Sequence, residues 1–395
     1  MGYYIETINE NVLKLIKCSL WGGDISDIHL DSNTYKEMKS QTLIGLPTSI
    51  LSGLHISPEL YDAWEKDILQ MIVYNKRCIY CQEHLPLTVP YVVLKGTTAA
   101  QYYPHPEYRA MGDIDIMIRR EDFDFACGEL KKAGYRIVKE LKREVGYEKN
   151  GIIVELHRYF ASLNNLEQAM YFDNLILSNI DETHRLPDLV NGLVLLEHIS
   201  QHMENGLGLR QVVDWMMFVN QCLNDANWSE FCKIAERIGL TNLAITITKM
   251  CVMYLGLPAR QWCEEAKEKT CQDLFSYIYS SGNFGNKQEH DTGRSIQAMY
   301  SVFSIKSLFA LLQKHGVYNW KLAQRNRFFR KFAWMYQIGH YVKKGFLRDE
   351  AFIKIRSEFR MVQKRRELFD ELGVKQLSKG VAMYENGKYK IKKHK

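Results

Sequence analysis

Apolar residues tend to recur every second position in strand-like runs between residues 91 and 160, whereas on both sides of this segment they recur every third or fourth position. A period of two is typical of a half-buried strand, and a period of 3.6 is typical of an amphipathic helix. The pattern therefore predicts an α+β fold, with a small mixed-sheet core between a helical N-terminal segment and a long helical C-terminal region. We expect the domain boundaries at residues 1–88, 89–180 and 181–395.

The core segment reads as an alternation of strands and helices. The predicted order is strand, helix, strand, helix and hairpin, over residues 91–94, 98–103, 113–118, 121–135 and 136–160. Asn150-Gly151 is a strong signal for a tight turn, so we expect it to join the two strands of the hairpin.

The composition argues against a membrane or secreted protein. No apolar run reaches the roughly 18 residues that a membrane span needs. The N-terminus carries acidic residues where a signal peptide needs basic ones. Nine cysteines are scattered among helix-like segments of a long chain, which favours reduced thiols over a disulfide framework. We therefore expect a cytoplasmic protein.

Positive charge is concentrated at the C-terminal end. Residues 321–395 hold 21 Lys and Arg against 7 Asp and Glu, a net charge of +14, whereas the rest of the chain carries −8. Such a basic tail indicates either a polyanionic partner or a solvated helical face.

Two aspartates stand two residues apart in Gly112-Asp113-Ile114-Asp115-Ile116. In a strand such residues point to the same face, while the isoleucines anchor the opposite face in the core. Neighbouring carboxylates repel each other unless a cation lies between them, and their oxygens suit Mg²⁺. A polar edge strand is the alternative, but aspartate is disfavoured in strands. The pair therefore predicts a magnesium site.

Two further segments point to the same chemistry. A predicted strand ends at Lys95-Gly96-Thr97, where glycine lets a phosphate approach the backbone and the next helix N-terminus favours an anion. Glu155 and His157 share one face of a later strand by the same period of two. The sequence thus offers a third carboxylate and a phosphate-binding turn.

The order of these features resembles the DNA polymerase beta-like nucleotidyltransferase superfamily. More narrowly, LKGTTAAQYYPHPEYRAMGDIDIMI followed by VELH and a helical tail is similar to the bacterial family of uncharacterised nucleotidyltransferases. The resemblance covers roughly residues 91–160 and, more weakly, 190–220. It implies that residues 89–180 form a nucleotidyltransferase core.

The resemblance also implies a role for each matching residue. In that superfamily the first two carboxylates hold two metal ions, which corresponds to Asp113 and Asp115 here. A third carboxylate binds one metal and helps to activate the acceptor hydroxyl, which corresponds to Glu155, where aspartate is commoner. The glycine-plus-hydroxyl motif holds the triphosphate, which corresponds to Gly96 and Thr97.

Three more residues near the motif have two interpretations each. Arg109 could add positive charge to a leaving pyrophosphate, or it could be an exposed loop arginine. Lys95 could likewise bind the nucleotide or be solvated. His157 could orient Glu155 or contact the acceptor, although a structural hydrogen bond is the simpler interpretation.

Two patterns in the helical region receive a structural interpretation. His198 and His202 stand one helical turn apart, but they lack the intervening glutamate of a zinc-binding helix and a third ligand. We therefore expect a packed helix there. Arg210 and Asp214 have the spacing of a helix-stabilising ion pair.

The functional prediction is a nucleotidyltransferase that moves a nucleoside monophosphate from an NTP, ATP included, to an unknown hydroxyl acceptor. The acceptor could be a small molecule, a sugar, a protein or RNA. We expect a two-metal mechanism with Mg²⁺, or Mn²⁺ as the alternative, and no membrane partner. The alternative is a catalytically degenerate nucleotide- or RNA-binding protein of the same fold.

Overall fold

The computed structural model describes residues 8–163, 165–203, 206–282, 309, 312–313, 316–346, 364–374, 381–385 and 388–392. The chain divides into two compact units. The first comprises Met1–Gln288, Glu371–Lys375 and Ala382–Ile391, and the second comprises Glu289–Asp370, Gln376–Val381 and Lys392–Lys395. The site discussed below lies within the first unit.

Five strands form one mixed sheet in the part of the chain that the structure describes up to Gly282. They are β1 (Tyr91–Val93), β2 (Ile114–Ile118), β3 (Arg136–Glu140), β4 (Glu144–Lys149) and β5 (Ile152–His157), in the spatial order β1-β2-β5-β4-β3. The β2–β5 pair is parallel and the other pairs are antiparallel. Together with the helices on both sides in sequence, this sheet confirms the predicted α+β fold.

The hairpin prediction was right about one turn and missed a strand. β4 ends at Lys149 and β5 begins at Ile152, and Asn150 and Gly151 both have positive φ, as a type I′ turn requires. Residues 136–160, however, contain three strands where two were expected. The additional strand β3 lies at the sheet edge with all five residues exposed, so it lacks the alternating apolar pattern that marks a half-buried strand.

One face of the sheet carries the core of this domain. The inward side chains of the central strands pack against α5 (Phe123–Lys132) and the C-terminal part of α3 (Pro58–Glu83). Ile116, Val154 and Leu156 are fully buried there, and each such side chain stabilises the fold by about 1.5–3 kcal/mol. Because side chains alternate along a strand, the residues between them point to the opposite face.

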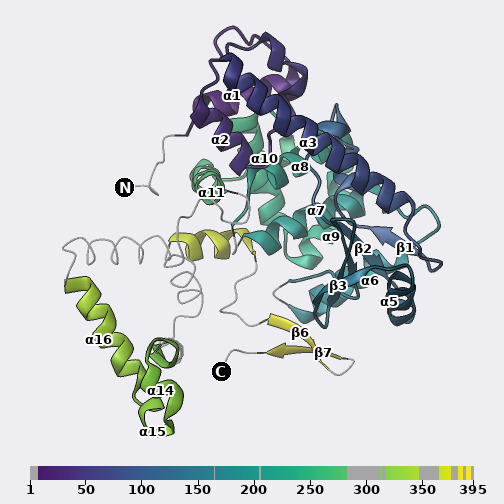
Figure 1. The fold of residues 1–395 in the computed structure, drawn as a ribbon. Coiled ribbons are helices and arrows are strands. Elements are labelled where there is room, and N and C mark those ends of the chain that lie inside the picture. The colour runs from purple at the N-terminus through teal and green to yellow at the C-terminus, as the bar shows by residue number, and fades with distance from the viewer. Residues whose placement is uncertain are drawn as a thin grey trace. The chain divides into compact units, whose positions relative to one another are not determined.

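Helices precede and follow the sheet in sequence, as the period of the flanking segments predicted (Figure 1). Before it lie α1 (Glu10–Trp21), α2 (Ser32–Ser40) and α3, and within it the short α4 (Thr97–Ala100). After it lie α6 (Leu166–Ser178), α7 (Asp188–His202), α8 (Leu209–Cys222), α9 (Trp228–Ile238), α10 (Thr241–Leu255) and α11 (Glu268–Ser281). Short 3₁₀ turns occupy Leu46–Ser49, Leu51–Gly53, Pro106–Tyr108 and Gln261–Cys263.

Local sequence signals set several of these helix ends. Ser57 caps α3, where its side chain accepts a hydrogen bond from the Leu60 amide and Pro58 occupies the first turn. Gly239 and Gly256 end α9 and α10 in the left-handed conformation. Among the described residues, none of the helices is both long enough and apolar enough to cross a membrane.

The basic region 321–395 is described in part. Its elements are α14 (Lys321–Arg325), α15 (Arg327–Arg330), α16 (Ala333–Phe346), β6 (Val381–Glu385) and β7 (Lys388–Lys392). The last two pair with each other as a two-stranded sheet. Residues 326, 331–332 and 364–374 are also described, with 364–372 helical, and the other residues of the region lie outside the described ranges.

Candidate functional site

The site is built on the two parallel strands at the centre of the sheet. The β2–β5 register places Asp115 beside Glu155 and Met117 beside His157. Since the isoleucines of β2 point into the core, Asp115 and Glu155 project from the opposite face, as does His157 two residues further along β5. Adjacent parallel strands therefore bring together residues that are 40 positions apart in the sequence.

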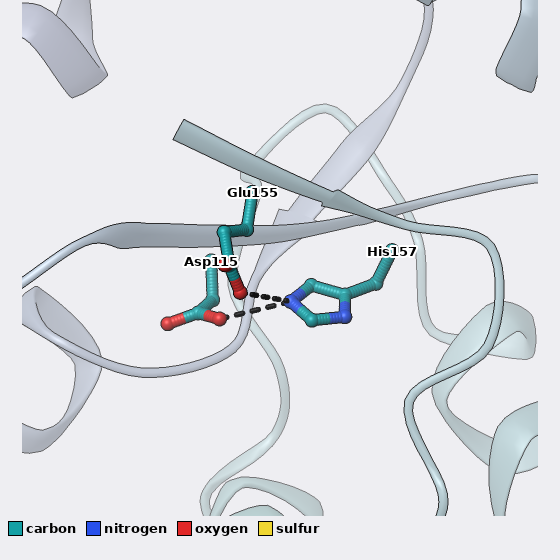
Figure 2. A group of neighbouring side chains, drawn as sticks. All are labelled: Asp115, Glu155 and His157. Carbon is teal, nitrogen blue, oxygen red and sulfur yellow. Dashed lines mark hydrogen bonds and ion pairs between the residues drawn. The ribbon is translucent and has the colours of Figure 1, made fainter. Parts of the chain in front are cut away.

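These three side chains converge on one point (Figure 2). Nε2 of His157 lies 2.8 Å from Oδ1 of Asp115 and 3.8 Å from Oε2 of Glu155. One ligand atom from each of the three residues lies within 4.8 Å of the other two. Two carboxylates and an imidazole at this spacing are able to share a metal ion.

Asp113 joins the same site from the loop before β2. Its side chain is exposed and lines the same cavity as Asp115, but Asp113 does not belong to the group of converging ligand atoms. Buried Asn75 of α3 positions this loop: its Nδ2 donates to the carbonyls of Glu107 and Arg109, and its Oδ1 accepts from the Met111 amide.

Asp115 is paired with the ammonium of Lys95 and with the imidazole of His157. Lys95 Nζ lies 2.9 Å from Oδ1 of Asp115, the same oxygen that His157 contacts. Burial by itself would raise the pKa of Asp115, but Lys95 and His157 lower it to about 2. The carboxylate therefore stays charged at neutral pH even though it is almost fully buried.

A fourth carboxylate, Glu144 of β4, faces the other side of the His157 ring. Its Oε2 lies 3.3 Å from Nδ1 of His157. Burial opposes the charged form of His157, yet its contacts with Asp115 and Glu144 raise its pKa. The pKa of Glu144 is lowered in turn, since His157 and Lys139 outweigh its burial. His157 is thus held between two acids, which fixes the orientation of its ring.

The edge strand β3 supplies a second lysine. Lys139 Nζ lies 2.6 Å from Glu144 Oε1 and 2.9 Å from Glu155 Oε1. These carboxylates raise the pKa of Lys139 against the effect of its partial burial. In the structure, the negative charge of the site is therefore balanced by protein cations.

The site lies in a cavity of about 410 Å³. The sheet contributes the carboxylates that line this cavity. Helices α7 and α8 contribute four further lining residues, His198, Gln201, His202 and Arg210. Burial and the charge of Lys95 hold the pKa of His198 well below its usual value and lower that of His202 to about 4, so both rings are neutral. The sheet side of the cavity thus carries acids paired with lysines, and the helical side carries Arg210 and two neutral imidazoles.

Arg210 is the most distinctive residue of the helical side. Its Nη1 donates to the Ala110 carbonyl at 3.1 Å, while its buried Nε has no hydrogen-bond partner among the described residues. Burial and neighbouring Arg109 lower its pKa. A half-buried arginine with a buried, unused Nε donor beside a cavity is suited to bind an anion.

The predicted nucleotide-binding residues are distributed differently around the cavity. Lys95 and Gly96 line it, and Gly96 has φ +70°, a conformation that favours glycine. The Thr97 hydroxyl instead donates to Gln82 Oε1 at 2.8 Å. Arg109 also lines the cavity, but it is buried rather than exposed.

Arg109 is held by a carboxylate of α8. Its Nε and Nη2 lie 2.7 and 2.6 Å from the two carboxylate oxygens of Asp214, and the Tyr103 hydroxyl donates to the same group at 2.7 Å. From its helical spacing, Asp214 is expected to pair with Arg210. It pairs with Arg109 because the loop before β2 packs directly on α8.

Sequence reasoning did not identify Lys139, Arg143, Glu144, Gln201 or Arg210 as residues of this cavity. The charged run Lys139–Glu144 shows no periodic pattern. Glu144 is recognised as a residue of the cavity only because it pairs with His157 across β4 and β5. His198 and His202 were noticed as a pair, but their position beside the carboxylates depends on how α7 packs.

Comparisons with known proteins address the chemistry of this cavity. No curated protein and no solved structure matches the chain. Residues 83–256 match the model of a family described as an uncharacterised nucleotidyltransferase. The matched range contains β1 to β5 and helices α7 and α8, and so every residue assigned above to the cavity. The match supports a nucleotidyltransferase assignment, and with it a nucleotidyl transfer function for this chain.

Proposed function

We propose that the protein transfers a nucleoside monophosphate from an NTP to a hydroxyl acceptor in the cavity between the sheet and helices α7 and α8. The observation that carries this proposal is the convergence of Asp115 and Glu155, with His157, within 4.8 Å on the face opposite the core. Such a cluster of acids, in a cavity that Arg109 and Arg210 also line, suits a metal-bound triphosphate.

The donor set fits divalent metal ions. We propose that Asp113, Asp115 and Glu155 hold two Mg²⁺ ions, or Mn²⁺, as in the DNA polymerase beta-like superfamily, and that His157 orients Asp115 and Glu155. The ions would neutralise the triphosphate and lower the pKa of the acceptor hydroxyl. Carboxylate oxygens are the preferred ligands of both metals. Lys95 and Lys139 already show that this cluster attracts positive charge.

The remaining cavity residues are assigned to the nucleotide and the acceptor. Lys95, Gly96 and Arg109 of the cavity, with Thr97 next to its lining, are proposed to bind the phosphates. Arg210 is added to them because of its unused buried donor. The acceptor oxygen attacks the α-phosphorus, the bond to the β-phosphate oxygen breaks, and pyrophosphate leaves. Glu155 is proposed to help activate the acceptor hydroxyl by taking its proton.

One observation favours a second candidate, a degenerate protein that binds nucleotide or RNA without turnover. Lys139 and Lys95 already pair with Glu155 and Asp115, and Asp113 stands apart from the converging group. A protein that had lost catalysis would keep such internal ion pairs. The two candidates differ in whether a nucleoside monophosphate is transferred.

Label transfer separates the two candidates. The full-length protein would be incubated with Mg²⁺ and each of the four NTPs labelled at the α-phosphate, with small-molecule, protein and RNA fractions offered as acceptors. Label on an acceptor from the α-phosphate, and none from the γ-phosphate, is expected for the enzyme. Metal-dependent NTP binding without transfer to any acceptor would support the degenerate protein instead.

We propose the cytoplasm as the place of this reaction. All nine cysteines are free thiols, as expected for a reducing compartment. We also propose that the chain is organised in three parts, residues 1–88, 89–180 and 181–395. In it, the sheet domain would carry the metals and the helical region would complete the acceptor side.

A further inference from the structure

A second cavity of about 520 Å³ lies on the other side of the central sheet. The C-terminal part of α3 forms one wall, and Tyr135 and the turn between β4 and β5 form the other. Ile152 lines this cavity and belongs to the core face of β5, whereas Glu155 points to the opposite face. This second cavity, called the groove below, is therefore separate from the candidate active site. What it binds does not depend on the proposed function.

The groove is positively charged. Lys76, Arg77 and Lys149 line it, and the described lining residues include no carboxylate. None of these three cations forms an ion pair with a residue that the structure describes. Lys149 is nevertheless held in place, because Nζ donates to the Ala133 carbonyl at 2.7 Å and lies 5.2 Å from the centre of the Tyr135 ring. Unneutralised cations at fixed positions attract a chain of phosphates.

An exposed aromatic platform stands beside these cations. Tyr80 is 65% exposed, although a tyrosine normally buries most of its ring. It stacks on His84 with ring centroids 4.1 Å apart, and Nδ1 of His84 hydrogen-bonds to the Tyr80 carbonyl at 2.8 Å. The histidine therefore supports the tyrosine ring in one orientation. A supported, exposed ring is a surface on which a nucleobase can stack.

We propose that this groove binds single-stranded nucleic acid, with a base stacked on Tyr80 and the backbone along Lys76, Arg77 and Lys149. Single-stranded nucleic-acid sites combine a basic groove with aromatic side chains in this way. A mononucleotide would gain little from a platform as open as Tyr80, whereas a strand spans it and reaches the neighbouring cations. An acidic peptide would use the cations but not the stacked rings.

Fluorescence anisotropy with the full-length protein and a labelled oligouridine of about 15 nucleotides tests the proposal. Tyr80→Ala should weaken binding about fivefold or more, since one stacked base contributes about that much. Lys76→Glu should also weaken binding and reduce the salt slope by about 0.7. Phe125→Ala and Lys66→Glu are the matched controls, because both side chains are exposed and lie outside the groove. Unchanged affinity in both groove variants would overturn the proposal.

Two further measurements locate the contact and identify the ligand class. An oligonucleotide with 4-thiouridine, cross-linked by light to the wild-type protein, should label Tyr80 or His84 at the C-terminal end of α3. Cross-links confined to residues 321–395 would show that the basic tail, and not the groove, binds the strand. Equal affinity for a duplex of the same length would contradict stacking on Tyr80, and competition by an acidic peptide alone would assign the groove to a protein partner.

Discussion

Lys139 Nζ lies 2.9 Å from Glu155 Oε1, so that the edge strand β3 is tied by an ion pair to a carboxylate of the central strand β5. The register of β3 against β4 shifts between Ile137 and Lys139, which marks an irregularity directly beside this lysine. Its ammonium is also shared with Glu144. A metal ion that binds Glu155 must therefore compete with the charge of Lys139 for this carboxylate.

We expect Lys139→Met to bind Mg²⁺ about fivefold more tightly than the wild type. The variant removes the competing cation, and a partly exposed ion pair of this kind stabilises by about 1 kcal/mol. Isothermal titration calorimetry on the metal-free protein measures the change. Lys142→Met is the control, since Lys142 is exposed in the adjacent turn. Weaker Mg²⁺ binding in Lys139→Met would show that the lysine supports the metal site.

The sequence allowed the central part of this site to be predicted, because strand periodicity determines which side chains share a face. The period of two sets Asp115 opposite Ile114 and Ile116, and it puts Glu155 on one face with His157. The structure has Asp115 and Glu155 side by side. The turn at Asn150-Gly151 was likewise readable from its residues.

The other members of the cavity could not be predicted because tertiary packing places them there. Arg210 and His198 lie on helices that follow the sheet in sequence, and no local pattern specifies which helix covers it. Glu144 reaches His157 only through the β4–β5 register, and β3 was missed because an exposed edge strand has no apolar alternation. Helical spacing predicts Arg210 as the partner of Asp214. The actual partner, Arg109, lies in the loop before β2.

The Asp113→Asn variant should lose label transfer while its free energy of unfolding stays nearly unchanged. Asp113 is exposed and lies just before β2, so the neutral amide should change the free energy of unfolding by no more than about 0.5 kcal/mol. If Asp113 holds a metal, label transfer from the NTP should fall at least about a hundredfold. Asp27→Asn, also exposed and outside the cavity, is the control. Unchanged transfer in Asp113→Asn would remove this residue from the metal set.

The ion pairs of the metal-free site should lower the free energy of unfolding both when the pH falls and when it rises. The folded state lowers the pKa of Asp115 from 3.8 to about 2, so its contribution is present above about pH 4 and is lost as the pH falls towards 2. The folded state raises the pKa of His157 above 6.5, so its contribution is complete below that value and is lost as the pH rises. The site therefore stabilises the fold most between about pH 4 and 6.5.

Urea unfolding in EDTA at pH 3, 5.5 and 8 tests this dependence. The lowered pKa of Asp115 stabilises the folded state by on the order of 2 kcal/mol above pH 4, and part of this should be lost at pH 3. Asp115→Asn should show a smaller loss between pH 5.5 and 3, and His157→Gln should show a smaller loss between pH 5.5 and 8. The same pH profile in the wild type and both variants would contradict the pairing.

Arg109 and Asp214 make a buried, bidentate ion pair that also receives the Tyr103 hydroxyl. Burial favours the neutral form of an arginine, yet Asp214 raises the pKa of Arg109, so the guanidinium stays charged. This pair joins the loop before β2 to α8 and so sets the distance between the two sides of the cavity. Arg109 therefore has a structural role in addition to its proposed contact with phosphate.

We expect Asp214→Asn to lower the free energy of unfolding by about 3 kcal/mol or more, because it leaves the Arg109 charge buried without a partner. The double variant Arg109→Met with Asp214→Leu removes both charges and should recover most of that loss. Urea unfolding measures the free energy of unfolding of both variants. If the double variant loses as much as Asp214→Asn, the ion pair itself stabilises the fold. If the double variant is stable but binds Mg²⁺-NTP more weakly than the wild type, Arg109 also contacts the nucleotide. Unchanged NTP binding would leave the phosphates to Lys95 and Arg210.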